Sequence, residues 1–340
     1  MIQDWGIVVQ NGGRWETALN RTKKAAALIA VLGLLSTTLL TGCDTPAGGG
    51  SGPGAPPADG PGASAAPPEY VIPQILVPSA PGDAVEENEK AVIDFSNAQD
   101  GYVMAKYRDR TEKQIRAIIT IPDETEYMYR LVPGGGFEVF PLSGGDGEYT
   151  VRVFEQVEGT KYALVLTATI GVALLDEFAP FLRPNQYVDF NRDSEVVRKA
   201  AELTAGADSL MEKIAAVYDY VIDNIDYDFA LAETVQSGYL PELDLVLERG
   251  LGICFDYAAV MTAMLRSQGI PAKLVIGYAG VAYHAWISVF SEETGWIDGL
   301  IFFDGENWRF LDPTFAATGD AGAVAEYIGS GTNYQAKFLY

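Results

Sequence analysis

The sequence has few of the residues from which metal sites and disulfides are built. It contains one histidine and two cysteines in 340 residues. A structural zinc site takes four ligands, mostly Cys and His, so this count almost excludes one. No EF-hand spacing occurs either, although so acidic a chain leaves calcium dependence open. We therefore expect no cofactor and no metal.

Basic residues are also scarce. Lys and Arg number 23 against 46 Asp and Glu, a formal net charge of −23. Nucleic acids and anionic lipid head groups are poor partners for such a surface, whereas basic peptides or amines would be attracted. An acidic surface that only keeps the protein soluble is the simpler interpretation. Electrostatic capture of basic peptides remains an alternative, and it would weaken with salt.

The apolar run from Ala25 to Leu40 is short for a membrane-spanning helix and is typical of a signal-peptide core. It ends in Leu-Thr-Gly-Cys43, which resembles the lipobox of bacterial lipoproteins, where the cysteine is lipidated. We expect residues 1–43 to be a signal peptide with its lipobox. The protein would then be extracytoplasmic and anchored to the bacterial cell membrane. An uncleaved signal anchor is the alternative.

Residues 44–69 are almost entirely Gly, Pro, Ala, Ser and Asp, a composition that cannot form a core. This segment is expected to be a disordered tether. If Cys43 carries lipid, Cys254 has no disulfide partner and is a free thiol on the oxidising side of the membrane.

Residues 88–178 are predicted to form an all-β domain. Short runs rich in β-branched and aromatic residues are separated by Gly-rich turns, which is typical of an antiparallel β-sandwich. The expected strands are 102–107, 115–121, 127–132, 149–155 and 162–169. The sandwich is expected to be structural or to present substrate, and the sequence does not distinguish these roles.

Residues 190–340 combine helices with strands. Helices are expected from Ser194, after the capping-box pattern Ser209–Glu212, and over 242–249. Another begins at Cys254 and ends at Gly269, with Pro271 just beyond. Strands are expected at 272–278, 282–290 and 307–311, and a closing strand over 337–340.

Three residues of this region suggest nucleophilic catalysis. Cys254 lies in the first turn of its helix, where unpaired N–H groups and the helix dipole favour a thiolate. His284, near the start of a strand, can take the thiol proton. Asp312, at the end of the next strand, can orient the imidazole. Taken singly, each has a structural alternative: a buried cysteine, a core histidine, a turn aspartate.

The motifs in this region resemble the transglutaminase-like core domain, in the family's order, from roughly Asp193 to Pro313. The resemblance implies a papain-like α+β fold and a Cys-His-Asp triad that works through a thioester, with Cys254 as nucleophile, His284 as base and Asp312 as orienting residue. The matching motifs are Gly-Ile-Cys254-Phe-Asp-Tyr-Ala, Gly269-Ile-Pro-Ala, Val275-Ile-Gly-Tyr278, His284-Ala-Trp286, Gly295-Trp296 and Leu311-Asp312-Pro-Thr314.

The resemblance also implies a second oxyanion donor beside the Cys254 amide, contributed from upstream of the cysteine. Tyr227 and Gln236 are the candidates, and a structural role for Tyr227 is equally open.

The predicted fold class is thus α+β: a papain-like, transglutaminase-like core of helices and antiparallel sheet, preceded by an all-β sandwich. The predicted function is a cell-surface lipoprotein that cleaves or transfers acyl groups from peptide or carboxamide substrates, with hydrolysis favoured over cross-linking. The alternative is a non-catalytic binding lipoprotein that uses the same fold as a scaffold.

Overall fold

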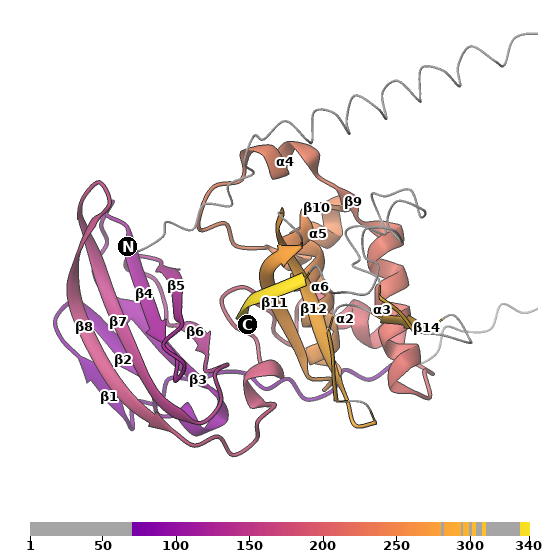
Figure 1. The fold of residues 1–340 in the computed structure, drawn as a ribbon, viewed down its shortest axis with the longest axis horizontal. Coiled ribbons are helices and arrows are strands. Elements are labelled where there is room, and N and C mark those ends of the chain that lie inside the picture. The colour runs from indigo at the N-terminus through magenta and orange to yellow at the C-terminus, as the bar shows by residue number, and fades with distance from the viewer. Residues whose placement is uncertain (1–69, 280–281, 294, 299–300, 304–307, 311–333) are drawn as a thin grey trace, which may run out of the picture. The chain divides into compact units, whose positions relative to one another are not determined.

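The computed structural model describes residues 70–279, 282–293, 295–298, 301–303, 308–310 and 334–340. The predicted signal peptide, the tether and Asp312 lie outside these residues. Pro68–Tyr340 belongs to one compact unit. Figure 1 shows its strand-rich first half in purple and magenta and its helix-and-sheet second half in orange and yellow.

The strand-rich half runs from Val85 to Val172 and contains two four-stranded antiparallel sheets (Figure 1). One has the order β1-β2-β3-β6, and the other the order β5-β4-β7-β8. The strands are β1 (Val85–Glu87), β2 (Ala91–Asp94), β3 (Tyr102–Tyr107), β4 (Ile115–Thr120), β5 (Glu126–Leu131), β6 (Glu138–Pro141), β7 (Gly147–Glu158) and β8 (Lys161–Val172).

Strand β7 buries alternate residues, whereas every residue of β2 is buried. In β7, Tyr149, Val151 and Val153 are fully buried, while the residues between them face outward. Tyr129 of β5 packs on Phe140 of β6, with ring centroids 4.6 Å apart, so aromatic side chains join the two sheets. The predicted sandwich is confirmed, and β1, β2 and β6 are strands that the sequence analysis did not predict.

The second half is built on helix α6 (Cys254–Ser267), whose residues from Phe255 onward are all buried. α6 contacts α2 (Glu195–Thr204), α3 (Leu210–Asn224) and α5 (Leu243–Arg249), and it also contacts β11 (Ala272–Ala279) and β12 (Ala282–Ser291). Figure 1 shows it between these helices and the orange strands. A helix that is buried on all sides requires such a central position.

The sheet beside α6 is antiparallel, with the order β13-β12-β11-β16. β13 (Gly295–Asp298) and β16 (Tyr334–Leu339) occupy its two edges. The strand expected at 307–311 is found as β15 (Trp308–Phe310), but it pairs with β14 (Ile301–Phe303) in a separate two-stranded sheet. β13 and β16 are the edge strands of the main sheet, and in the described residues neither of them pairs with β15.

Candidate active site

A left-handed glycine and a short pair of strands just before Cys254 set its position. After α5, Gly250 adopts a left-handed conformation with φ of +59°, and a Cβ there would lie 2.9 Å from the Asn224 carbonyl oxygen. β10 (Leu251–Gly252) then pairs in parallel with β9 (Asp226–Tyr227). Cys254 follows as the first residue of α6, half-buried, while the rest of the helix is enclosed. The nucleophile candidate therefore begins the most buried helix of this half but keeps access to a cavity.

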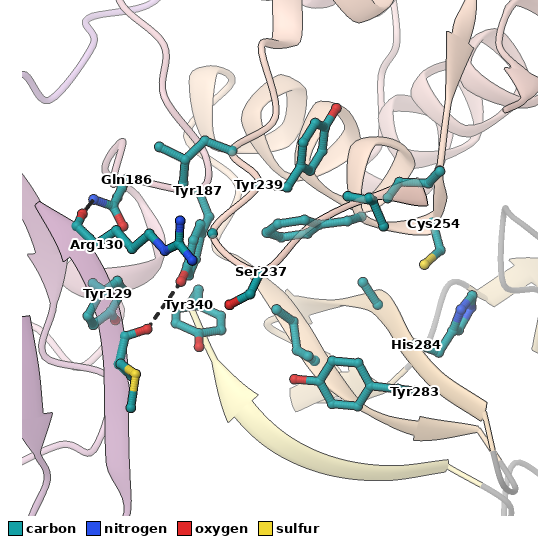
Figure 2. Close-up of a pocket in the computed structure, with 18 of the residues that line it drawn as sticks. Tyr129, Arg130, Gln186, Tyr187, Ser237, Tyr239, Cys254, Tyr283, His284 and Tyr340 are labelled. Atoms are coloured by element: carbon teal, nitrogen blue, oxygen red, sulfur yellow. Dashed lines mark hydrogen bonds between the residues drawn. The ribbon is translucent and has the colours of Figure 1, made fainter. Parts of the chain in front are cut away.

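His284 lies on β12, directly opposite Gly277 of β11. Its side chain is buried, with 8 % of its surface exposed, and its ring stacks on Trp286 at a centroid distance of 6.5 Å. Figure 2 shows the Cys254 sulfur on the side of its backbone that faces His284. Both residues line one cavity of about 150 Å³. The tertiary structure thus brings the predicted nucleophile and the predicted base to the same space.

The cavity walls are mainly aromatic. Tyr187 stacks on Tyr129 at 5.5 Å and meets Phe255 edge-on at 5.4 Å and Tyr340 edge-on at 4.7 Å, measured between ring centroids. Tyr283, the residue before His284 on β12, also lines the cavity (Figure 2). Burial raises the pKa of Tyr283 well above its ordinary value, so its hydroxyl stays protonated at neutral pH. The walls therefore offer apolar surface with a few hydroxyl groups.

The remaining predicted site residues fall in different places. Tyr227 lines the cavity. Gln236 is exposed, and its side-chain amide donates a hydrogen bond to the Thr234 carbonyl oxygen at 2.7 Å. Asp312 and Cys43 lie outside the described residues, so their roles stay predictions.

A buried carboxyl group next to the nucleophile was not anticipated as part of the site. Asp256 is fully buried in the first turn of α6. It accepts hydrogen bonds from the Ile253 N–H at 2.8 Å and the Tyr239 hydroxyl at 2.9 Å. Burial raises its pKa to about 6, against the lowering effect of these two bonds. Tyr239 belongs to the segment after α4 (Phe229–Thr234), so this carboxyl ties one cavity wall to the turn that holds Cys254.

The sequence contained a partial signal for Asp256. An acidic residue in the first turn of a helix commonly accepts a hydrogen bond from the free N–H groups there. Its partner Tyr239 lies 17 residues earlier, and no spacing rule connects the two.

Among the residues described, no three His, Cys, Asp or Glu side chains lie together in a way that could hold a metal ion. In the same part of the chain, no helix is both long and apolar enough to span a membrane.

Comparison with known proteins agrees with the motifs. Residues 197–298, which include Cys254 and His284, match the Transglutaminase-like superfamily. The predicted family resemblance is therefore confirmed over this region, and with it the α+β fold class. The match supports an enzyme at a coarse level, and its range ends before Asp312.

Two bacterial proteins are similar in sequence. The uncharacterized protein YebA of Bacillus subtilis is 28 % identical over 122 residues, which are 29 % of this chain and 16 % of YebA. The uncharacterized protein ML0607 of Mycobacterium leprae is 26 % identical over 224 residues, 64 % of this chain and 75 % of that protein.

Two solved structures are also similar. One, from Cytophaga hutchinsonii, is provisionally described as a cysteine protease. It is 20 % identical, has a TM-score of 0.32, and the match covers 68 % of this chain and 80 % of that one. Red sea bream transglutaminase is 12 % identical with a TM-score of 0.28, covering 64 % and 53 %.

Proposed function

We propose that this protein is a cell-surface lipoprotein that cleaves peptide or carboxamide bonds through a thioester on Cys254. The observation that carries the proposal is the shared cavity of Cys254 and His284, the chain's single histidine. The cysteine is the first residue of α6, where backbone N–H groups have no partner within the helix. The match of this region to a catalytic family supports the same reaction class.

The proposed reaction has two halves. His284 takes the thiol proton, and the Cys254 sulfur attacks the carbonyl carbon. The bond from that carbon to nitrogen breaks, the imidazolium returns its proton to the leaving amine, and an acyl-thioester remains. Water then attacks the thioester, His284 accepts its proton, and the carboxylic acid leaves as the thiol re-forms. Asp312 is proposed to hold the imidazole from its other ring nitrogen.

Hydrolysis is preferred to amine transfer. An amine acceptor is cationic at neutral pH and would favour a carboxylate at its binding site. Among the described residues that line the cavity, none is Asp or Glu. Tyr227 lines the same cavity and is the better placed of the two candidate oxyanion donors, since Gln236 points its amide to a neighbouring backbone carbonyl.

The remaining parts of the proposal concern location and partners. Lipid on Cys43 would anchor the protein outside the cell membrane, and residues 44–69 would hold the folded part away from it. The substrate would be a peptide or protein, including those of the cell wall or surface. No nucleic acid is expected as a partner.

The test is the pH dependence of iodoacetamide alkylation at Cys254, measured by peptide mass spectrometry on the full chain and on His284→Ala. We expect rapid modification well below pH 8.5, the ordinary thiol pKa, and slow modification in His284→Ala. The urea-unfolded chain provides the rate of an unactivated thiol.

The competing function is a binding lipoprotein in which this fold is only a scaffold. It predicts that Cys254 follows ordinary thiol titration, with no difference between the wild-type chain and His284→Ala. That result would refute the enzyme proposal and direct attention to ligands of the sandwich.

A further inference from the structure

The charge of the cavity differs from the charge of the chain. Acidic residues outnumber basic ones two to one in the sequence. Yet the described residues that line the cavity include two arginines, Arg116 and Arg130, and no carboxylate. Asp256, the buried carboxyl beside the nucleophile, is turned to the Ile253 N–H and the Tyr239 hydroxyl and is not part of the lining. A ligand in this space therefore meets positive charge.

The two arginines face one another across neighbouring strands. Arg116 of β4 is the direct partner of Arg130 of β5 in the antiparallel register. Like charges in such a position repel. Arg116 also stacks on Tyr162, with its guanidinium carbon 4.1 Å from the ring centroid. Both side chains are part of the cavity lining.

Arg130 is held in place by its surroundings. Its backbone carbonyl accepts a hydrogen bond from the Gln186 side chain. Gly238 packs against its side chain so closely that a Cβ there would lie 2.3 Å from both Cδ and Nε of Arg130. Figure 2 shows Arg130 extending from its strand toward the segment that carries Ser237. Within the described part of the chain, its guanidinium has no carboxylate within 4.0 Å. An arginine fixed beside a cavity and without an acidic partner can receive a carboxylate in two parallel hydrogen bonds.

We propose that Arg130 is a specificity residue that binds a carboxylate of the substrate, so that the enzyme acts on peptides or amides that carry a carboxylate close to the scissile carbonyl. The proposal rests on the proposed function, because it takes the carbonyl at Cys254 as the reacting group. The aromatic walls of the cavity would contact the part of the substrate between its carboxylate, at Arg130, and its scissile carbonyl, at Cys254. A peptide with an acidic side chain or a free terminal carboxylate near the cleaved bond has this chemistry.

The probes are thiol-reactive compounds in matched pairs. Iodoacetyl-glycine, iodoacetyl-β-alanine and iodoacetyl-4-aminobutyrate carry a carboxylate at increasing distance from the reacting carbon, and the primary amide of each is its neutral counterpart. The ratio of acid to amide alkylation rates at Cys254 is measured on the full chain by peptide mass spectrometry. This ratio cancels the intrinsic reactivity of the thiol.

In the wild-type protein we expect that, for one of the three probe lengths, the acid reacts about tenfold faster than its amide. This is a modest effect for a hydrogen bond to a charged group. Arg130→Gln should lose this preference. Arg130→Lys, which keeps the charge but not the planar fork, should retain only part of it. Arg198→Gln on α2, which removes the same charge from an exposed position, should behave as wild type.

An acid-to-amide ratio that is the same in the wild type and in Arg130→Gln, in chains with unchanged circular dichroism, would overturn the proposal. So would an equal fall of the ratio in Arg198→Gln, because the effect would then come from overall charge. If Arg130→Gln fails to fold, Arg130→Lys is compared with the wild type instead, and an unchanged acid-to-amide ratio in Arg130→Lys overturns the proposal. Failure of the proposed function has a different signature: slow alkylation by the neutral amides that does not depend on His284.

Discussion

The two halves of the molecule bury charge in different ways. In the sandwich, the carboxylate of Glu155 is met by opposite charge: Lys90 Nζ lies 2.6 Å from it, Lys113 pairs with its other oxygen, and the Tyr107 hydroxyl donates to it. In the helix-and-sheet half, neither Arg266 nor Asp256 has an ion-pair partner in the described part of the chain. Backbone groups and one hydroxyl satisfy them instead.

The pKa directions follow from this difference. Hydrogen bonds from Lys113, Lys90 and Tyr107 lower the pKa of Glu155 to about 2. Burial raises the pKa of Asp256 to about 6. Burial also lowers the pKa of Arg266 to about 9, which still leaves the guanidinium charged at neutral pH. Where the fold supplies opposite charge, the ionised form is favoured, and where it supplies only dipoles, burial disfavours it.

The largest expected effect on stability is that of Arg266. Its guanidinium donates to three backbone carbonyls from separate segments: Arg183 at 2.7 Å, Ala272 at 2.9 Å and Tyr340 at 2.6 Å. Arg266→Met removes all three donors, although the Tyr340 carbonyl keeps the Leu274 N–H at 2.9 Å. We expect a cost of about 3 kcal/mol or more in the free energy of unfolding. Urea unfolding measures it.

Arg198→Met is the matched control, because Arg198 is exposed on α2 and forms ion pairs with acidic neighbours on the same helix. It should cost less than about 1 kcal/mol. Equal costs for the two substitutions would mean that the carbonyl contacts of Arg266 do not stabilise the fold.

The next effect is the pH dependence due to Asp256. Its pKa is about 6 in the folded chain and near its ordinary value of 3.8 when unfolded, so the folded state binds the proton more tightly. The stability that this proton contributes is fully present below about pH 4 and is lost as the pH rises through about 6. The total loss in the free energy of unfolding is up to about 3 kcal/mol. Asp256→Asn has no proton to lose, so its stability relative to wild type should rise from pH 4 to pH 7.

Urea midpoints at four pH values measure this trend, with the exposed Asp193→Asn as control. A constant difference between Asp256→Asn and wild type over the range would contradict the burial argument.

The smallest expected effect on stability is that of Glu155, and its pH dependence is opposite in sign to that of Asp256. Its lowered pKa means that its contribution is present above the ordinary value of 4.5 and is lost as pH falls toward about 2. Glu155→Gln should therefore cost about 1 to 2 kcal/mol at pH 7, because its lysine partners are half-exposed, and less at pH 3. Glu126→Gln, whose carboxylate is an exposed partner of Arg152 in the same sheet, is the control. A loss of stability in Glu155→Gln that grows as the pH falls would contradict the stabilising role given to the Glu155 carboxylate.

Much of the local structure could be predicted from the sequence. The capping box at Ser209 is present, with Ser209 accepting from the Glu212 N–H and Glu212 accepting from the Ser209 N–H. Cys254 begins its helix as expected, and His284 lies on its predicted strand. These features depend on residues a few positions apart, so a local pattern is sufficient to indicate them.

The pairing of distant segments could not be predicted. β16 was expected as a strand, but nothing in its residues shows that it pairs with β11, some sixty residues earlier, and so closes the sheet beside α6. The same holds for Arg130, a residue of the sandwich that meets the cavity of Cys254. Such contacts depend on which faces remain unpaired after the local elements form.

The sequence by itself determined the class of fold, the helix that begins at Cys254 and the pairing of that cysteine with the chain's one histidine as candidates, because these follow from composition, periodicity and motif order. Only the tertiary structure decided what surrounds the nucleophile: a cavity with aromatic walls and an arginine from the sandwich, and a buried carboxyl behind it. The physical reason is that segments far apart in the sequence together determine the burial and the charge of a site, and they do so only once they are packed against one another.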